Sequence, residues 1–305
     1  MEAVKKPVAR ARLTIERARA DHGWFDVAYR TFKRFGEDEG PTFAAALTYF
    51  TFFSIFPLLL FATAALGYIT FGNEALQDRL IQSGLSTIPI LKDALTPDGL
   101  EIIQKNKGSI ALTGAALALY TGTGAIAALN HALNQINHVE KERNFLQKRL
   151  VAVVWLGVLG LAALASLALS VASGALPGIA ATILGAIGAI AVSTGLFATA
   201  FRFLTTKQQS WRDVLPGAFV AAIGFEILKQ VGSWFIERGD AGRNATFGAF
   251  AGAAALLIAS YLISQIVLLS AEVNAVLAER RAARQASPAI ATTSPGHSRG
   301  HSQDK

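Results

Sequence analysis

The sequence predicts an all-α polytopic membrane protein with six transmembrane helices. Stretches without a charged residue cover 40–73, 108–139, 150–201 and 244–271. A helix needs about 20 mostly apolar residues to cross the hydrocarbon core, so the stretch 150–201 is long enough for two helices. A further run begins at Val214 and is interrupted only by Glu226 and Lys229. Together these runs predict six spans.

Composition supports the same class. Hydrophobic residues make up 52% of the chain and charged residues 16%, which is below the roughly 25% usual for soluble domains. The chain has no cysteine. Disulfides, a thiolate nucleophile and a cysteine-ligated zinc ion are therefore excluded.

Three regions are predicted along the chain. Residues 1–40 form a cytoplasmic N-terminal segment, 41–279 the membrane domain, and 280–305 a disordered cytoplasmic tail rich in Ser, Pro, Thr and Gly. The six spans are expected at about 42–70, 108–130, 150–174, 178–201, 213–236 and 246–278.

The N-terminal segment contains a predicted amphipathic helix. Its apolar face consists of Trp24, Phe25, Ala28, Phe32 and Phe35, and its polar face of Asp26, Arg30, Lys33 and Arg34. This pattern is typical of a helix that lies in the membrane interface.

The distribution of lysine and arginine predicts the orientation. Nine of these residues lie within 1–39, and others follow spans 2, 4 and 6. The positive-inside rule places this basic side, with both termini, in the cytoplasm. No signal peptide is recognised before Pro41, so insertion is expected to depend on the internal spans. The net charge of +7 reflects topology, and nucleic-acid binding is not expected because the cations are spread over several loops.

Two charged residues interrupt the fifth span. Glu226 and Lys229 are three residues apart on one helix face, near or beyond the middle of the span. A charge at that depth costs several kcal/mol unless it is paired or hydrated. Two interpretations remain open: a binding or coupling pair in a hydrated cavity, and an internal ion pair that fixes the rotation of the helix.

Polar residues also gather at the predicted cytoplasmic ends of two spans. Asn130 and Asn134 lie one helical turn apart in span 2, and Glu272 and Asn274 lie near the end of span 6. We expect a polar cluster that faces the cytoplasm, with interfacial capping as the alternative for each residue.

The first span has hydroxyl groups next to a proline. Tyr49 and Ser54 precede Pro57, which removes a backbone hydrogen bond and kinks a helix. Neighbouring hydroxyls can satisfy the carbonyl that the proline leaves free. A structural kink and a gating hinge are both consistent with this pattern.

Several motifs resemble the YihY/BrkB family of bacterial inner-membrane proteins. They are the first-span segment 46–57, the segment from Ala132 to Phe145, the Leu-Pro-Gly-Ala segment with Pro216 and Gly217, the Phe-Gly-Ala segment at 247–249, and the segment 271–275. The resemblance covers about residues 24–280. Departures occur at Asn137, where relatives often have an aromatic residue, and at Ser260 and Ser264, in a stretch that is usually apolar.

This resemblance implies a six-span envelope protein whose relatives are linked to serum resistance, envelope integrity and the movement of lipid A precursors. The family name ribonuclease BN is not supported by the residues. A two-metal nuclease needs a dense cluster of histidine and aspartate ligands. The five histidines lack such spacing, and only His131 and His138 lie near a structured polar region, where they could share a helix face. We therefore expect no enzyme activity, no metal and no cofactor.

Two functions are consistent with these features. The favoured one is a transporter of lipid or another amphiphile, with membrane lipids as its partners. The alternative is a non-transporting scaffold for envelope integrity. It would bind an envelope protein through the 71–107 loop or through the basic cytoplasmic face. The sequence does not specify the substrate, the driving force or the oligomeric state.

Overall fold

The computed structural model describes residues 19, 21–69, 97–141, 143–174, 179–239 and 248–291. Within these ranges the chain is helical and has no β-strand, which confirms the all-α prediction. The helices are α2 (Gly23–Glu37), α3 (Gly40–Ile69), α6 (Pro97–Ile136), α7 (Phe145–Gly174), α8 (Ile179–Leu204), α9 (Trp211–Gly239) and α10 (Gly248–Ala291).

Each predicted span falls on one of the six long helices from α3 to α10. Four of these helices hold a stretch, within the described residues, that is long and apolar enough to cross a membrane. These stretches are Gly108–Ile136, Gly185–Leu204, Trp211–Trp234 and Gly252–Gln285. By length and composition the chain therefore has several membrane-spanning candidates.

Two helices extend further than the sequence predicted. α6 begins at Pro97, inside the predicted 71–107 loop, and proline is favoured at a helix start because the first N–H groups need no partner there. α10 continues past residue 280 to Ala291, so it includes the first part of the predicted disordered tail. Arg280 and Arg281 bind carboxylates on other helices, which holds this part of α10 in place. Residues 70–96 and 292–305 lie outside the described residues.

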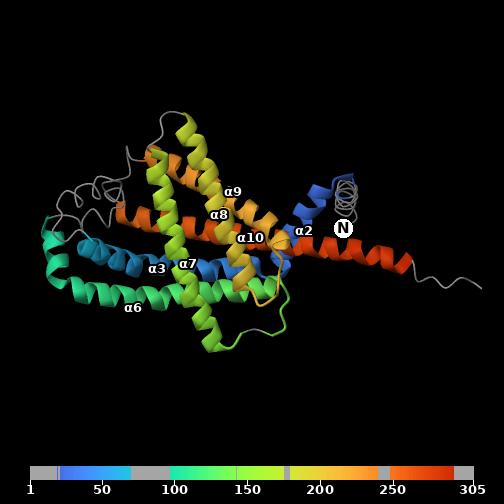
Figure 1. Cartoon of the computed structure of the whole chain (residues 1–305), viewed down its shortest axis with the longest axis horizontal. Coiled ribbons are helices and arrows are strands. Elements are labelled where there is room, and N and C mark those ends of the chain that lie inside the picture. Colours follow the sequence, from blue (N-terminus) through green and yellow to red (C-terminus); the bar gives the residue numbers. More distant parts are fainter. Residues whose placement is uncertain are drawn as a thin grey trace, which may run out of the picture.

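The long helices form two sets in space. α3, α6 and α10 run side by side, while α7 and α8 cross them steeply (Figure 1). α9 packs between α8 and α10. The short helix α2 lies against α10 near one end of this arrangement, and it joins α3 through the two-residue turn Asp38–Glu39.

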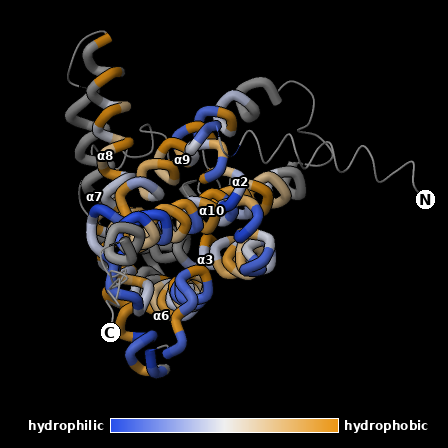
Figure 2. The backbone as a smooth tube through the Cα atoms, turned by 90° about the vertical axis from the view of Figure 1, so that its right-hand side faces the viewer, coloured by the Kyte–Doolittle hydropathy of each residue, from blue (hydrophilic) through white to orange (hydrophobic). Residues whose placement is uncertain are grey.

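The best-buried part of the core lies where several helices end or begin. Ile136 closes α6, Leu204 closes α8, Val214 is in the first turn of α9, and Leu268 of α10 packs with them. Hydrophilic residues gather near the same end, over α2, the later part of α10 and the segment after α6 (Figure 2). The fold therefore brings buried polar groups from distant segments next to the apolar core.

Candidate functional site

Asn130 and Asn134 form one hydrogen-bonded group at the end of α8. Asn134 Nδ2 donates to Asn130 Oδ1 at 3.3 Å, and Asn130 Nδ2 donates to the carbonyl of Leu204. Asn134 Oδ1 accepts from Thr205 Oγ1 at 3.1 Å and from the N–H of Thr206 at 2.8 Å. The two asparagines therefore fix the chain where it leaves α8, which agrees with the capping alternative.

Arg143 reaches the same helix end from the segment between α6 and α7. Its guanidinium donates to the carbonyls of Leu204 at 3.0 Å, Phe203 at 3.1 Å and Thr205 at 3.1 Å. The last carbonyls of a helix lack partners within the helix and carry partial negative charge. Arg143 was part of a sequence motif, but the sequence did not indicate this capping role.

The second group joins the start of α9 to α10. Pro216 has no N–H, so the carbonyl of Arg212, four residues earlier, loses its usual donor. Arg281 of α10 donates to this carbonyl at 2.8 Å. The same guanidinium lies 2.6 Å from Asp213 Oδ1. An arginine on α10 thus satisfies the backbone group that the proline of α9 leaves free.

Gly217 lets α9 and α10 approach at this point. Its N–H donates to Asn274 Oδ1 at 2.6 Å, and Asn274 Nδ2 donates to the carbonyl of Val214 at 3.1 Å. A Cβ atom at Gly217 would lie 2.2 Å from the backbone oxygen of Ser270. Only glycine fits this contact, which gives a physical reason for the Pro-Gly pair.

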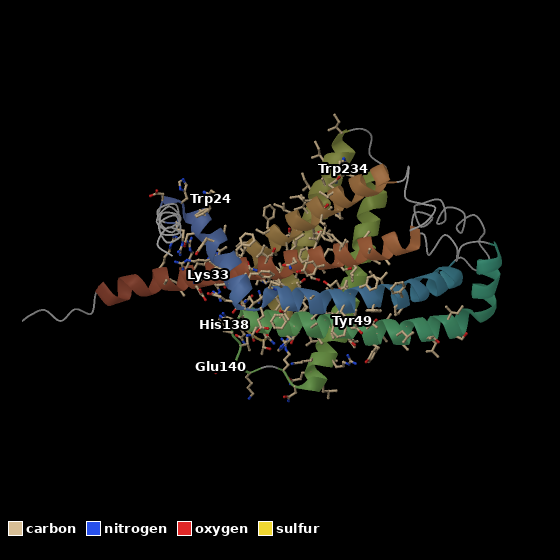
Figure 3. All side chains as sticks on the ribbon, turned by 180° about the vertical axis from the view of Figure 1, so that it is seen from behind. Trp24, Lys33, Tyr49, His138, Glu140 and Trp234 are labelled. Carbon is tan, nitrogen blue, oxygen red and sulfur yellow. The ribbon has the colours of Figure 1, made fainter. Side chains whose placement is uncertain are left out.

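Glu272 faces α2 instead of the asparagines. Its side chain is completely buried, and Arg34 Nε lies 3.7 Å from Glu272 Oε2. Arg34 also contacts Glu279 Oε1 through Nη1 at 2.6 Å and Asp38 Oδ2 through Nε at 3.9 Å. Its Nη2 lies 3.0 Å from His138 Nε2. Figure 3 shows Lys33 and His138 near this junction of α2 and α10.

Asp26 provides a second attachment of α2 to α10. Its carboxylate accepts hydrogen bonds from Arg19 at 2.7 Å and from Arg280 of α10, and Arg30 Nε lies at 2.9 Å. Burial by itself would raise the pKa of Asp26, but the hydrogen bonds from Arg19, Arg280 and Arg30 outweigh it and lower the pKa to about 2. The polar side of α2 therefore holds this helix on the protein.

Glu226 and Lys229 form the predicted ion pair, with Lys229 Nζ 2.7 Å from Glu226 Oε1. The pair is not sealed inside the helix bundle of the described residues. The Lys229 side chain is 46% exposed and that of Glu226 is 20% exposed. Lys229 Nζ also lies 5.2 Å from the centre of the Phe225 ring, at cation–π distance.

Among the described side chains of α3, Ser54 donates to a carbonyl other than the one that Pro57 leaves free. The proline lies inside a helix that continues on both sides, and Ser54 Oγ donates to the Thr51 carbonyl at 2.8 Å. The carbonyl left free by Pro57 belongs to Phe53, four residues earlier. Tyr49 lies on the exposed face of α3, with its ring 4.8 Å from that of Phe53.

The histidines near the polar end lie in different contacts. The His131 ring packs edge-on against Phe43, with 5.5 Å between ring centres. α6 ends at Ile136, and His138 follows it with a positive φ of 49°. The expectation that the two histidines share a helix face is therefore wrong, because the helix stops between them.

Of the four residues in the predicted cluster, all are buried near one end of the helices, but they take part in three separate contact groups. The three family departures are hydrogen-bonded, Asn137 to the segment after α8, and Ser260 and Ser264 to each other within α10. Asn137 Oδ1 accepts from Gln209 at 2.6 Å, and Ser264 Oγ donates to the Ser260 carbonyl at 2.8 Å. Sequence reasoning missed Arg34 and Asp26 as attachment points, because it assigned them to the solvated face of an interfacial helix.

Comparison with known proteins identifies the family. The model for a family described as virulence factor BrkB matches residues 31–292. The chain belongs to the BrkB family. This agrees with the sequence motifs, and it makes the protein an integral membrane protein with several apolar helices.

Relatives of this BrkB-family protein differ in how much of their length is matched. The putative ribonuclease-like protein YfkH of Bacillus subtilis is 26% identical, with 82% of this chain and 94% of YfkH covered. A UPF0761 membrane protein of Methylibium petroleiphilum is 28% identical, but the match covers 83% of this chain and 62% of that protein. The inner membrane protein YhjD of Escherichia coli is 25% identical, and the match covers 79% of this chain and 78% of YhjD. No solved structure matches the chain.

Proposed function

We propose that this BrkB-family protein lies in the bacterial inner membrane and moves a lipid or another amphiphile across or within the bilayer. The Glu226–Lys229 pair carries this proposal, because it places a half-exposed cation next to a mostly buried carboxylate within an apolar span. Ionisable residues at membrane depth are expensive and are candidates for a substrate path.

The position of the pair suits a lipid headgroup. Glu226 is eight residues from Trp234, the last residue of the apolar stretch of α9, which is about 12 Å along a helix. Lys229 can attract a phosphate and Glu226 an amine, while the acyl chains remain in the surrounding bilayer. A lipid can reach this face sideways from the membrane, since the described residues leave Lys229 about half exposed.

Lipid movement in proteoliposomes tests the proposal. The Glu226→Gln/Lys229→Gln double variant is expected to reduce the rate at least tenfold, because it removes both charges and keeps similar side-chain volumes. The exchanged variant Glu226→Lys/Lys229→Glu is the matched control and is expected to retain movement, since both charges remain. Headgroup-labelled phospholipid and a lipid A precursor are compared, and the fold is checked by thermal melting.

If folded wild-type protein moves neither lipid, direct movement of these substrates is wrong and the scaffold alternative gains. The basic cytoplasmic face gives the scaffold alternative less support than the Glu226–Lys229 pair gives to lipid movement. Arg34, Arg143, Arg280 and Arg281 of that face bind groups of the protein itself. Most of the proposed 71–107 surface lies outside the described residues.

We also propose that the protein is not an enzyme, whatever the name of YfkH. A nuclease of the two-metal kind requires ligands for both ions, and His131 and His138 are engaged with Phe43 and Arg34. Purified protein is expected to leave RNA intact with added divalent metal ions.

The finer topology, six spans with cytoplasmic termini and an interfacial α2, is likewise a proposal. Trp24 and Phe32 support it, because they are 71% and 65% exposed while Asp26 and Arg34 hold the other side of α2. Trp24 lies at the outer end of α2 in Figure 3. Interfacial binding needs such an apolar face beside cationic groups.

Single cysteines introduced into this cysteine-free chain test the topology. An impermeant thiol reagent applied outside the cells is expected to label Ala241→Cys and to spare Gln208→Cys until the inner membrane is permeabilised. A polarity-sensitive dye on Phe32→Cys is expected to report a lipid environment. Labelling of residue 208 from outside would reverse the orientation, and a water-like signal at residue 32 would remove α2 from the interface.

A further inference from the structure

Three buried carboxyl oxygens at the junction of α2 and α10 lack a hydrogen-bond donor among the described residues. They are Asp38 Oδ2, Glu272 Oε1 and Glu272 Oε2. A buried polar atom without a partner costs about 1–3 kcal/mol, and more when it is charged. Glu272 is completely buried, so bulk solvent does not reach its two oxygens. The described residues therefore leave these carboxyl oxygens without the donors that two carboxylates need.

The local charges do not balance around these oxygens. Arg34 is one cation, and it faces the carboxyl groups of Asp38, Glu272 and Glu279. α3 contributes no Asp, Glu, Lys, Arg or His to the junction, because its sequence contains none.

The other cations that the structure describes near the junction have carboxylates of their own. Arg280 binds Asp26, Arg281 binds Asp213 on α9, and Lys33 lies 3.4 Å from Glu37. His138, just beyond α6, also contacts Arg34, with its Nε2 3.0 Å from Arg34 Nη2. Arginine can only donate hydrogen bonds, so Arg34 is the donor in this contact.

Asp38 Oδ2 and Glu272 Oε2 both approach the same nitrogen, Arg34 Nε, at 3.9 Å and 3.7 Å. Two carboxylates cannot bond to each other, because both only accept hydrogen bonds. One proton between them solves this problem: it makes one group a donor, removes one negative charge, and leaves the remaining charge facing Arg34. We propose that Asp38 and Glu272 form a proton-binding site that holds α2 against α10.

A metal ion fits the junction less well than a proton. Within the part of the chain that the structure describes, no three His, Asp or Glu side chains converge in an arrangement that could hold a metal ion. The site has a mechanical consequence, because Asp38 lies in the short turn between α2 and α3. Loss of the proton places extra negative charge beside Glu279 and favours separation of α2 from α10.

Two measurements on the full chain in detergent test the site. First, the melting temperature of the wild type is expected to fall as the pH rises, because the bound proton is then lost from the folded state. Glu272→Gln mimics the protonated acid, so this variant is expected to lose most of that fall. Glu279→Gln removes an exposed carboxylate that pairs with the same arginine, Arg34. This variant is expected to keep the pH dependence of the wild-type melting temperature.

Second, infrared spectra at neutral pH are expected to show a protonated carboxyl band in the wild type. The band is expected to disappear in Glu272→Gln and also in Asp38→Asn, whose amide can donate to an ionised Glu272. The proposal is overturned if the wild type has no such band, or if wild type and Glu272→Gln share one pH dependence. It is also overturned if added sodium or magnesium ions, instead of protons, raise the melting temperature of the wild type alone. None of these readouts depends on lipid movement.

Discussion

Adding one methyl group at Gly217 is expected to destabilise the protein by about 3 kcal/mol, the upper end of the usual cost of overpacking. The Cβ atom of Gly217→Ala would lie 2.2 Å from the Ser270 carbonyl oxygen and 2.6 Å from two atoms of Asn274. The backbone oxygen cannot rotate away, so α9 and α10 must separate. Separation would also break the hydrogen bonds that Asn274 makes to Gly217 and Val214.

Thermal melting in detergent measures this effect. Gly232→Ala is the matched control, because it lies on the same helix and a Cβ atom there meets nothing within 4 Å. Alanine is favoured over glycine in helices by about 1 kcal/mol, so the control is expected to be neutral or slightly stabilising. Equal melting temperatures for the two variants would show that the contact between α9 and α10 is looser than the structure indicates.

Replacing Asp26 by asparagine is expected to release α2 from α10. The substitution leaves Arg19, Arg30 and Arg280 facing one another without an anion. Breaking a fully buried pair costs about 3–5 kcal/mol, and we expect about 1–3 kcal/mol here because these arginines keep some contact with water. Amide hydrogen exchange of residues 23–37 is expected to accelerate, with less change in α6 or α9.

Glu37→Gln is the control on the same helix. Glu37 is exposed and its pair with Lys33 is 3.4 Å long, so the expected change is within about 0.5 kcal/mol.

The stabilisation that Asp26 provides also has a defined pH dependence. Its pKa falls from the ordinary 3.8 to about 2 in the folded protein, so the stabilisation is complete above pH 3.8 and is lost as the pH falls toward 2. Exchange in α2 that does not respond to Asp26→Asn would contradict this attachment.

The helix class and the approximate spans could be read from the sequence, because a bilayer requires long apolar runs. The ends of the helices could not be read from the sequence. Hydropathy gives no signal for the start of α6 at Pro97, inside a stretch that holds several charged residues. Nor does it show that α10 continues to Ala291, since the ion pairs that hold it involve residues from about 70 to 250 positions away.

In the candidate site, too, the sequence predicted some contacts and only the packing of the helices decided the others. The spacing of Glu226 and Lys229 on one helix turn predicted their ion pair, because residues three apart are neighbours on a helix. The exposure of the two side chains depended on the packing of α9 against α8 and α10. The asparagines and Glu272 were recognised as polar residues at helix ends, but their partners come from α2, α9 and the segment after α8.

By itself the sequence determined that this BrkB-family chain is helical, apolar and basic on one predicted side, because these properties are local sums over residues. The tertiary structure alone decided that the polar face of α2 binds α10, and that one arginine faces three carboxyl groups. Such contacts depend on which helices meet and at what angle, and a short-range pattern carries no information about either.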